Sequence, residues 1–177
     1  MKSAKKILAL ILAGVMALAL LTGCGKATSL DRTIAEGLAE YLKLELAEEN
    51  NNNISVSYQV PELSRDIAPL FDKNWIMLDG TNYRLNEDCK INGEPIKEAL
   101  ADILRPYKST SIVFFSAADV TDVKTPFMET SNLTEWMINL DIFDGTPNPT
   151  SITSLKIAVT HKTVNGRTYA LAMIIAE

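Results

Sequence analysis

The sequence has few of the residues from which most catalytic and metal sites are built. Its 177 residues include one histidine and two cysteines, so a metal site made of several imidazoles and a Cys-x-x-Cys redox pair are both excluded. The eight glycines form neither a phosphate-binding loop nor a Gly-x-Ser-x-Gly turn around a nucleophilic serine. We therefore predict no catalytic residue, no cofactor and no metal ion.

Basic residues are scarce relative to acidic ones. The chain has 17 Lys and Arg against 22 Asp and Glu, and three of the lysines lie within the first six residues. Residues 24–177 consequently carry 14 basic and 22 acidic groups, a formal charge of −8. Such a charge disfavours contact with a phosphate backbone, so we expect no nucleic acid partner.

The first residues have the pattern of an export signal. Residues 1–6 are cationic, and Ile7–Leu21 is an apolar run without a charged residue, an order typical of a secretory signal peptide. The run is shorter than the roughly 20 residues that a membrane-spanning helix needs. Leu21-Thr-Gly-Cys24 follows directly and resembles the lipobox of bacterial lipoproteins.

That resemblance implies where the mature protein lies. Residues 1–23 would be removed as the lipoprotein signal peptide, and Cys24 would become the N-terminus with a diacylglyceryl group on its thiol. Residues 24–29 would then be a lipidated tether, and residues 30–177 a single globular domain. Because two or more acyl chains such as palmitate bind a bilayer stably, we expect membrane lipid to hold acylated Cys24 at the extracytoplasmic face of the cell membrane.

Three stretches of the domain have the pattern of helices. Apolar residues recur every fourth position from Leu30 to Leu46, which predicts a helix over about 30–49. A second helix is predicted over 94–105, where the apolar spacing is also helical and Pro106 follows. Pro61 favours a short helix over 61–71.

The C-terminal residues predict a β-hairpin with a defined register. Val164-Asn-Gly-Arg167 contains the Asn-Gly pair of a type I′ turn, which pairs Val164 with Arg167 and His161 with Ala170. One face of the hairpin then carries Leu155, Ile157, Val159, His161, Ala170, Ala172, Ile174 and Ala176. The other face carries Ala158, Thr160, Tyr169, Leu171, Met173 and Ile175.

These elements predict the fold class. Residues 111–116 are a continuous apolar run that favours an interior strand, and 54–58 alternates like a short one. The last strand is apolar on both faces, so helices must cover both sides of its sheet. We predict an α+β domain, a three-layer α/β/α sandwich with a small antiparallel sheet that ends in the C-terminal hairpin.

The C-terminal third resembles a known secreted family. Thr134-Glu-Trp-Met137, a Pro-rich loop, Ile157-Ala-Val159 and Gly166–Ile174 are similar in order to the CAP domain of cysteine-rich secretory and pathogenesis-related proteins. The resemblance implies a three-layer sandwich that ends in a hairpin. The family's His and Glu cavity has no counterpart here, because the chain has a single His and no Gly-Glu-Asn segment.

The single imidazole is the one candidate residue of a cleft. His161 is interpreted as a structural residue at the sheet margin, and the alternative is a cleft that it lines together with hydroxyls from 109–111 or 150–154. Cys89 follows two acidic residues, which disfavours a reactive thiolate. Three carboxylate pairs could hold a calcium ion or do acid-base work, namely Glu87 with Asp88, Asp119 with Asp122, and Asp141 with Asp144, but none has EF-hand spacing. Asp119 is instead expected to cap the segment that follows it, with Asp122 in the first turn.

We therefore predict a membrane-anchored lipoprotein of the cell envelope whose domain binds a protein, a peptide or a wall component without catalysing a reaction. The alternative is a lipid-anchored hydrolase, or a degenerate CAP-like domain, that uses His161. A third hypothesis makes the domain a passive part of a larger envelope complex, for which a large exposed apolar patch would be the sign.

Overall fold

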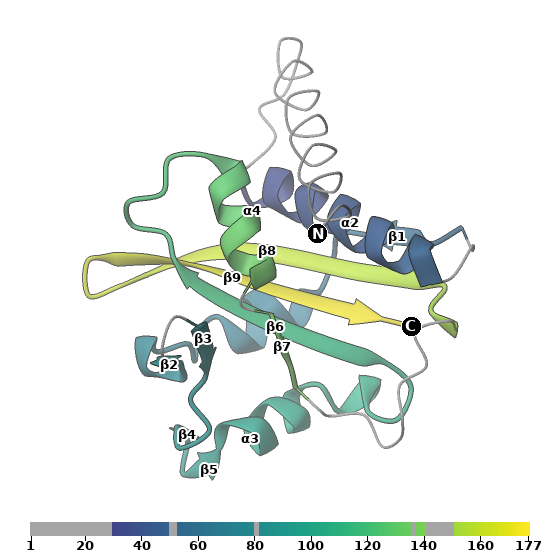
Figure 1. Cartoon of the computed structure of the whole chain (residues 1–177). Helices are drawn as coiled ribbons and strands as arrows, with labels where there is room; N and C mark the ends of the chain where they lie inside the picture. The colour runs from purple at the N-terminus through teal and green to yellow at the C-terminus, as the bar shows by residue number, and fades with distance from the viewer. Residues whose placement is uncertain (1–29, 50–52, 80–81, 136, 141–150) are drawn as a thin grey trace.

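The structure of the protein is a computed structural model that describes residues 30–49, 53–79, 82–135, 137–140 and 151–177 (Figure 1). The predicted signal peptide, Cys24 and the predicted tether lie outside the described residues, as do Trp136 and the Pro-rich loop of 141–150. In chain order the elements are α2 (Leu30–Glu49), β1 (Ser55–Ser57), η1 (Leu63–Ile67), η2 (Lys73–Trp75), β2 (Ile76–Asp79), β3 (Asn82–Leu85), β4 (Lys90–Ile91), β5 (Glu94–Pro95), α3 (Ile96–Ile103), η3 (Arg105–Tyr107), β6 (Ile112–Asp119), α4 (Pro126–Glu135), β7 (Ile138–Asn139), β8 (Ser154–Val164) and β9 (Arg167–Ala176).

A five-stranded sheet with the order β1-β8-β9-β6-β7 forms the middle of the domain. The pairs β8–β9, β9–β6 and β6–β7 are antiparallel, whereas β1 runs parallel to β8. The α+β prediction is confirmed, and the expectation of a purely antiparallel sheet is wrong for β1. The reason is connectivity, because a tight turn imposes antiparallel pairing only on strands that it joins, and β1 precedes β8 by most of the domain.

The C-terminal hairpin has the predicted register. Val164 pairs with Arg167 and His161 with Ala170, and the turn between them has positive φ values of 52° at Asn165 and 79° at Gly166. Positive φ at both central residues is the signature of a type I′ turn. The two strands therefore direct their side chains to the faces that the sequence predicted.

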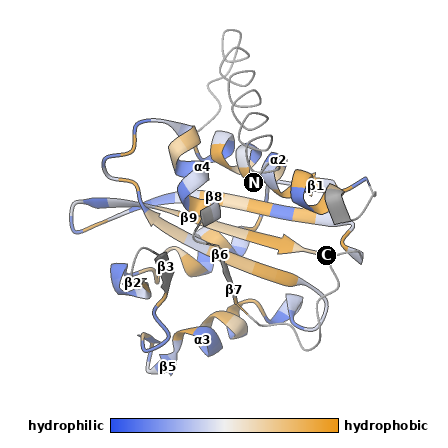
Figure 2. Ribbon diagram, in the orientation of Figure 1, coloured by the Kyte–Doolittle hydropathy of each residue, from blue (hydrophilic) through white to orange (hydrophobic). Residues whose placement is uncertain are grey.

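Helical layers cover both faces of the sheet, which confirms the three-layer sandwich (Figure 1). Helices α2 and α4 pack on the face of Ile157 and Ala172, while η1, α3 and the β2–β3 hairpin pack on the face of Leu171 and Met173. The strands between them are the most continuously apolar part of the ribbon (Figure 2). Burial on both sides explains why β9 lacks the alternation of polar and apolar residues that a half-exposed strand shows.

The two helices on the first face approach each other closely. A Cβ atom built at Gly37 of α2 would lie 2.9 Å from Oγ1 and 3.2 Å from Cγ2 of Thr130 in α4. A side chain at position 37 would therefore force the helices apart. Glycine is required here because it lets α4 reach the sheet beside α2, which brings α4 side chains near β8.

One predicted local role is wrong. Asp119 does not cap a helix, because it is the last residue of β6 and the next helix, α4, begins at Pro126. Its Oδ1 accepts hydrogen bonds from the amide of Thr121 at 3.1 Å and from the hydroxyl of Thr121 at 2.6 Å, and its Oδ2 pairs with Arg167. The carboxylate thus secures the turn after β6 to the hairpin. Among the described helices, none has the length and apolar character needed to cross a bilayer.

Candidate functional site

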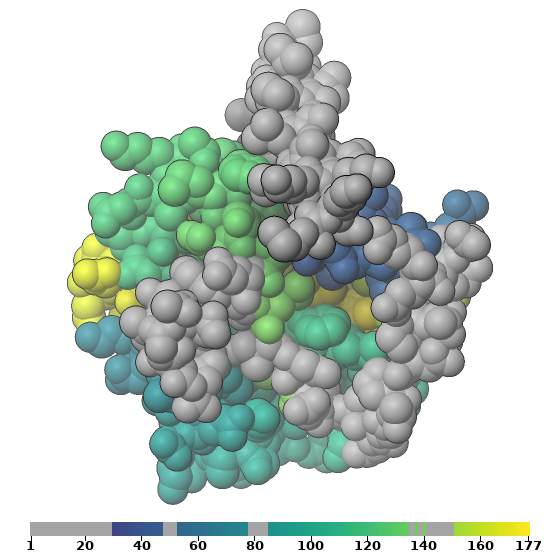
Figure 3. Space-filling model, in the orientation of Figure 1, coloured from purple at the N-terminus to yellow at the C-terminus, as the bar shows by residue number. Residues whose placement is uncertain are grey.

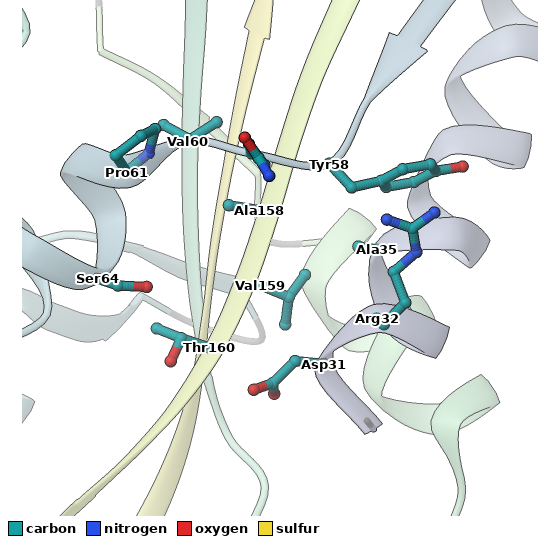
Figure 4. Close-up of a pocket in the computed structure, with 11 residues that line it drawn as sticks. Asp31, Arg32, Ala35, Tyr58, Val60, Pro61, Ser64, Ala158, Val159 and Thr160 are labelled. Carbon is teal, nitrogen blue, oxygen red and sulfur yellow. The ribbon is translucent and has the colours of Figure 1, made fainter. Parts of the chain in front are cut away.

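A pocket of about 510 Å³ lies along the outer edge of β8, and we refer to it as the β8 pocket. Its floor is formed by Ala158, Val159 and Thr160 of β8. The first two turns of α2 form one wall, and Ser64 of η1 forms the other together with the segment 58–61 that connects β1 to η1. Figure 4 shows Asp31 and Arg32 on one side of the β8 ribbon and Ser64 on the other.

The position of the pocket follows from the path of the chain. Strand β1 pairs with β8 only as far as Ser57, which lies opposite Lys156. The chain then leaves the sheet edge, because Tyr58 packs with the α2 side of the core while Val60 packs with the η1 side. This crossover closes one end of the β8 pocket and leaves the following residues of β8 beside it.

Arg32 of the α2 wall stacks on Tyr58, the first residue of the connecting segment 58–61. The guanidinium carbon of Arg32 lies 3.6 Å from the centroid of the Tyr58 ring, within the range of a cation–π contact. The Nε atom of Arg32 also donates to Glu36 at 2.7 Å. These contacts place the polar guanidinium in the same pocket as the apolar side chains of Ala35 and Val159.

Two neighbouring residues of β8 tie the walls of the β8 pocket to the sheet. On the η1 side, the ammonium group of Lys162 donates to the carbonyl oxygens of Ala68 and Pro69, the latter at 2.9 Å. On the α2 side, Nδ1 of His161 bonds to the carboxylate of Asp31. Because consecutive strand residues point to opposite faces, each wall is anchored by its own residue.

The imidazole of His161 lies between two carboxylates. Besides Asp31, its Nε2 meets Oε2 of Glu129 in α4 at 2.7 Å. The Glu129 side chain is only 4% exposed, whereas that of Asp31 is 36% exposed. The histidine therefore links α2 and α4 to β8, with a solvated partner on one side and a buried partner on the other.

These partners favour the charged form of the imidazole. The hydrogen bond to Asp31 is the largest influence and raises the pKa of His161 above its ordinary value of 6.5, burial acts in the opposite direction, and the bond to Glu129 raises the pKa further. A doubly protonated ring can donate to both carboxylates at once. The charged form of the imidazole therefore suits a position between two carboxylates.

Among the described residues, the structure does not bring His161 together with the hydroxyls of 109–111 or 151–154. Ser111 and Ser154 lie at the end of the sheet where Ile112 and Leu155 face Ala176. His161 faces Ala170, near the hairpin end. That part of the prediction is wrong, since residues 154 and 161 of β8 lie about 23 Å apart along the strand at 3.3 Å per residue.

One acidic residue of each described pair is held by another contact. Glu87 pairs with Lys97 at 3.3 Å, and Asp119 binds Thr121 and Arg167. No group of three or more His, Cys, Asp or Glu side chains suited to a metal ion occurs among the described residues. Asp31 and Glu129 do not form such a group with His161, because they bind different nitrogens of its ring.

Several large aromatic residues belong to the core. Trp75, Phe115 and Tyr169 are buried, and Phe71 connects them through ring contacts of 5.5 Å to Trp75 and 5.3 Å to Tyr169. Cys89 is a free, half-buried thiol packed against the same core. By contrast, the tip of the β8–β9 hairpin emerges at the surface (Figure 3).

Sequence reasoning missed the partners of His161 and the residues of the β8 pocket. Asp31 lies in the first turn of the helix predicted over about 30–49, where an acidic residue needs no distant partner, and Glu129 lies in a segment for which the sequence predicted no helix or strand. The sequence offered one indication of a partner for His161, namely the acidic Glu129 inside the otherwise weakly charged α4 segment. Comparison with known proteins adds no assignment, because no family model, no curated protein and no solved structure matches this chain.

Proposed function

We propose that the chain is a lipoprotein of the cell envelope, held at the extracytoplasmic face of the cell membrane by acyl groups on Cys24, and that its domain is a non-enzymatic binding module. The lipobox-like Leu21–Cys24 after an uncharged apolar run supports the anchor. The β8 pocket supports the binding role, because it is open, mixed in polarity and built on anchored elements. The proposed ligand is a protein, a peptide or a wall component.

The chain length places the proposed ligand near the membrane. Asp31, in the α2 wall of the β8 pocket, is seven residues after Cys24. Seven residues span at most about 25 Å when fully extended. A ligand of the β8 pocket would therefore be bound within reach of the bilayer surface, where the acidic character of the domain disfavours direct adhesion to anionic lipid headgroups.

The geometry at His161 does not favour the alternative of a hydrolase. A histidine acts as a general base through a free ring nitrogen within hydrogen-bond reach of the proton that it removes. Both ring nitrogens of His161 are bound to carboxylates, and the partner of Nε2 is buried. Catalysis would require the ring to leave one of these anions. The degenerate CAP-like domain and the passive assembly part remain proposals that no observation here favours.

The anchor is tested by mass spectrometry of the protein purified from the membrane fraction of its native host. We expect a mature N-terminus at Cys24 that carries diacylglyceryl and fatty acid, and a Cys24→Ala variant that keeps its signal peptide or leaves the membrane fraction. Wild-type protein recovered from the cytosol with its initiating methionine and without fatty acid would contradict the proposal.

The binding role is tested by photo-crosslinking in cells. A photoreactive phenylalanine analogue in place of Gln59, which is exposed and lines the β8 pocket, should form a discrete adduct with the ligand. The same analogue at Lys124, exposed on the loop before α4, serves as the matched control. Adducts from both positions alike, or from neither, would count against a binding module at the β8 pocket.

A further inference from the structure

Alternate residues of β8 direct their backbone N–H and C=O groups away from β9, to the outer edge of the strand. In a two-residue hairpin the residues that flank the turn exchange hydrogen bonds, so Val164 pairs in this way with Arg167, and every second residue before it is also bonded to β9. The intervening residues, including Val159, direct their N–H and C=O groups to the outer edge. The bond from the amide of Ser55 to the carbonyl of Thr153, 3.1 Å long, confirms this alternation.

Beyond Lys156 this outer edge is not covered by any strand of the described residues. Residues 157–161 span about 16 Å at 3.3 Å per residue, which is enough for an added strand of four or five residues. Val159 lies in the middle of this stretch and on the floor of the β8 pocket. An unpaired row of backbone donors and acceptors is a template for another extended chain.

The two walls match the alternation of side chains along such a chain. Consecutive residues of a strand point to opposite faces of the sheet. At this edge, one face is bounded by Asp31, Arg32 and Ala35 of α2, and the other by Pro61 and Ser64. Both walls are tied to β8, through His161 and Lys162. The edge therefore has a preformed subsite on each side rather than a single hollow.

We infer that the β8 pocket is a β-augmentation site, which rests on the proposed binding function. An extended polypeptide segment of a partner protein continues the sheet where β1 leaves it, pairs its main chain with Val159 and places alternate side chains against α2 and η1. Main-chain pairing supplies affinity and the flanking subsites supply selectivity in this mode of recognition. The formal charge of −8 on residues 24–177 steers a segment of net positive charge to the site.

The test uses the full-chain lipoprotein in nanodiscs and a random ten-residue peptide library displayed on phage. Peptides enriched on the wild-type protein are synthesised, and their affinities are measured by fluorescence anisotropy. Val159→Pro removes the outward N–H without removing a bond to β9, because proline is tolerated where the N–H faces away from the ladder. Thr163→Pro makes the same change on the same edge outside the β8 pocket and is the matched control.

We expect Val159→Pro to weaken binding about tenfold or more, since a hydrogen bond is lost and its acceptor in the peptide is left unpaired, whereas Thr163→Pro should bind like the wild type. Methylation of successive peptide amides provides a measurement that needs no protein variant. Only alternate amides of an added strand bond to β8, so N-methylation should abolish binding at every second peptide residue and be tolerated between.

Losses that do not alternate along the peptide, or equal binding by the wild type and a folded Val159→Pro variant, overturn the inference. It is also overturned if no peptide is enriched and the photoreactive group at Gln59 captures a ligand that is not a polypeptide, a result that leaves the proposed binding function intact. Mature protein without lipid on Cys24 refutes only the membrane anchor. If the photoreactive group at position 59 forms no adduct in cells, the binding module is refuted.

Discussion

The strongest prediction concerns the pair formed by His161 and the buried Glu129. Replacing His161 with alanine leaves the Glu129 carboxylate, whose side chain is 4% exposed, without its cationic partner. Removing one member of a buried ion pair costs about 3–5 kcal/mol. The lost contact with Asp31 adds at most about 1 kcal/mol, because that side chain is 36% exposed and water screens the pair.

The assay is unfolding in urea followed by circular dichroism, with thermal unfolding alongside it. For a domain of this size, 1 kcal/mol lowers Tm by about 2–4 °C, so His161→Ala should lower Tm by roughly 10 °C. The control replaces both His161 and Glu129 with leucine. Because apolar residues of similar volume often substitute for a buried ion pair without loss, the double variant should be more stable than the single one.

The contacts of His161 with Asp31 first, and then with Glu129, also predict how stability depends on pH. The pKa of His161 is raised in the folded state, so the folded protein retains a proton that the unfolded chain releases above pH 6.5. The free energy of unfolding that protonated His161 contributes is complete below pH 6.5 and declines as the pH rises through the raised pKa, with a slope of at most about 1.4 kcal/mol per pH unit. His161→Ala should lack this decline. A cost below about 1 kcal/mol for His161→Ala, or the same alkaline decline in both proteins, would refute the reasoning.

Three further predictions follow from the fold. Gly37→Ala should destabilise the domain by about 1–3 kcal/mol through its clash with Thr130, despite a gain in helix propensity of about 1 kcal/mol. Adding Thr130→Ala should restore much of the lost stability, measured by unfolding in urea. Gly166→Ala should cost roughly 1–2 kcal/mol, because φ there is 79°, and a normal Tm for the variant would contradict the turn assignment. Burial raises the pKa of Asp119, but hydrogen bonds from Thr121 and Arg167 outweigh it and lower the pKa. The stability that this carboxylate contributes is therefore present above about pH 3.8 and declines as the pH falls through the lowered pKa. Unfolding of Asp119→Asn followed at decreasing pH should lack that part of the decline.

Local patterns predicted the elements that depend on neighbouring residues. Apolar residues at every fourth position predicted α2 with its observed bounds, Leu30–Glu49. The Asn-Gly pair determined the hairpin register, because a two-residue turn leaves one way to pair the strands. That register also placed each side chain of β8 and β9 on the correct face and required the helical layers on both sides.

Other features depend on segments that meet only after folding. The direction of β1 and its early departure from the sheet edge were not predictable, since the partner strand lies far along the chain and no turn connects the two. The β8 pocket exists because of that departure. A pattern confined to residues 54–58 or to the hairpin contains no information about the space between them.

The contrast is sharpest at His161. The sequence by itself determined that this residue lies on the same face as Ile157 and Val159, because register and alternation are local properties of a strand. Only the tertiary structure decided what the imidazole binds, since Asp31 is 130 residues away and Glu129 is 32 residues away. Their approach depends on α2 and α4 packing side by side at Gly37, and long-range contacts of this kind are set by the packing of whole elements.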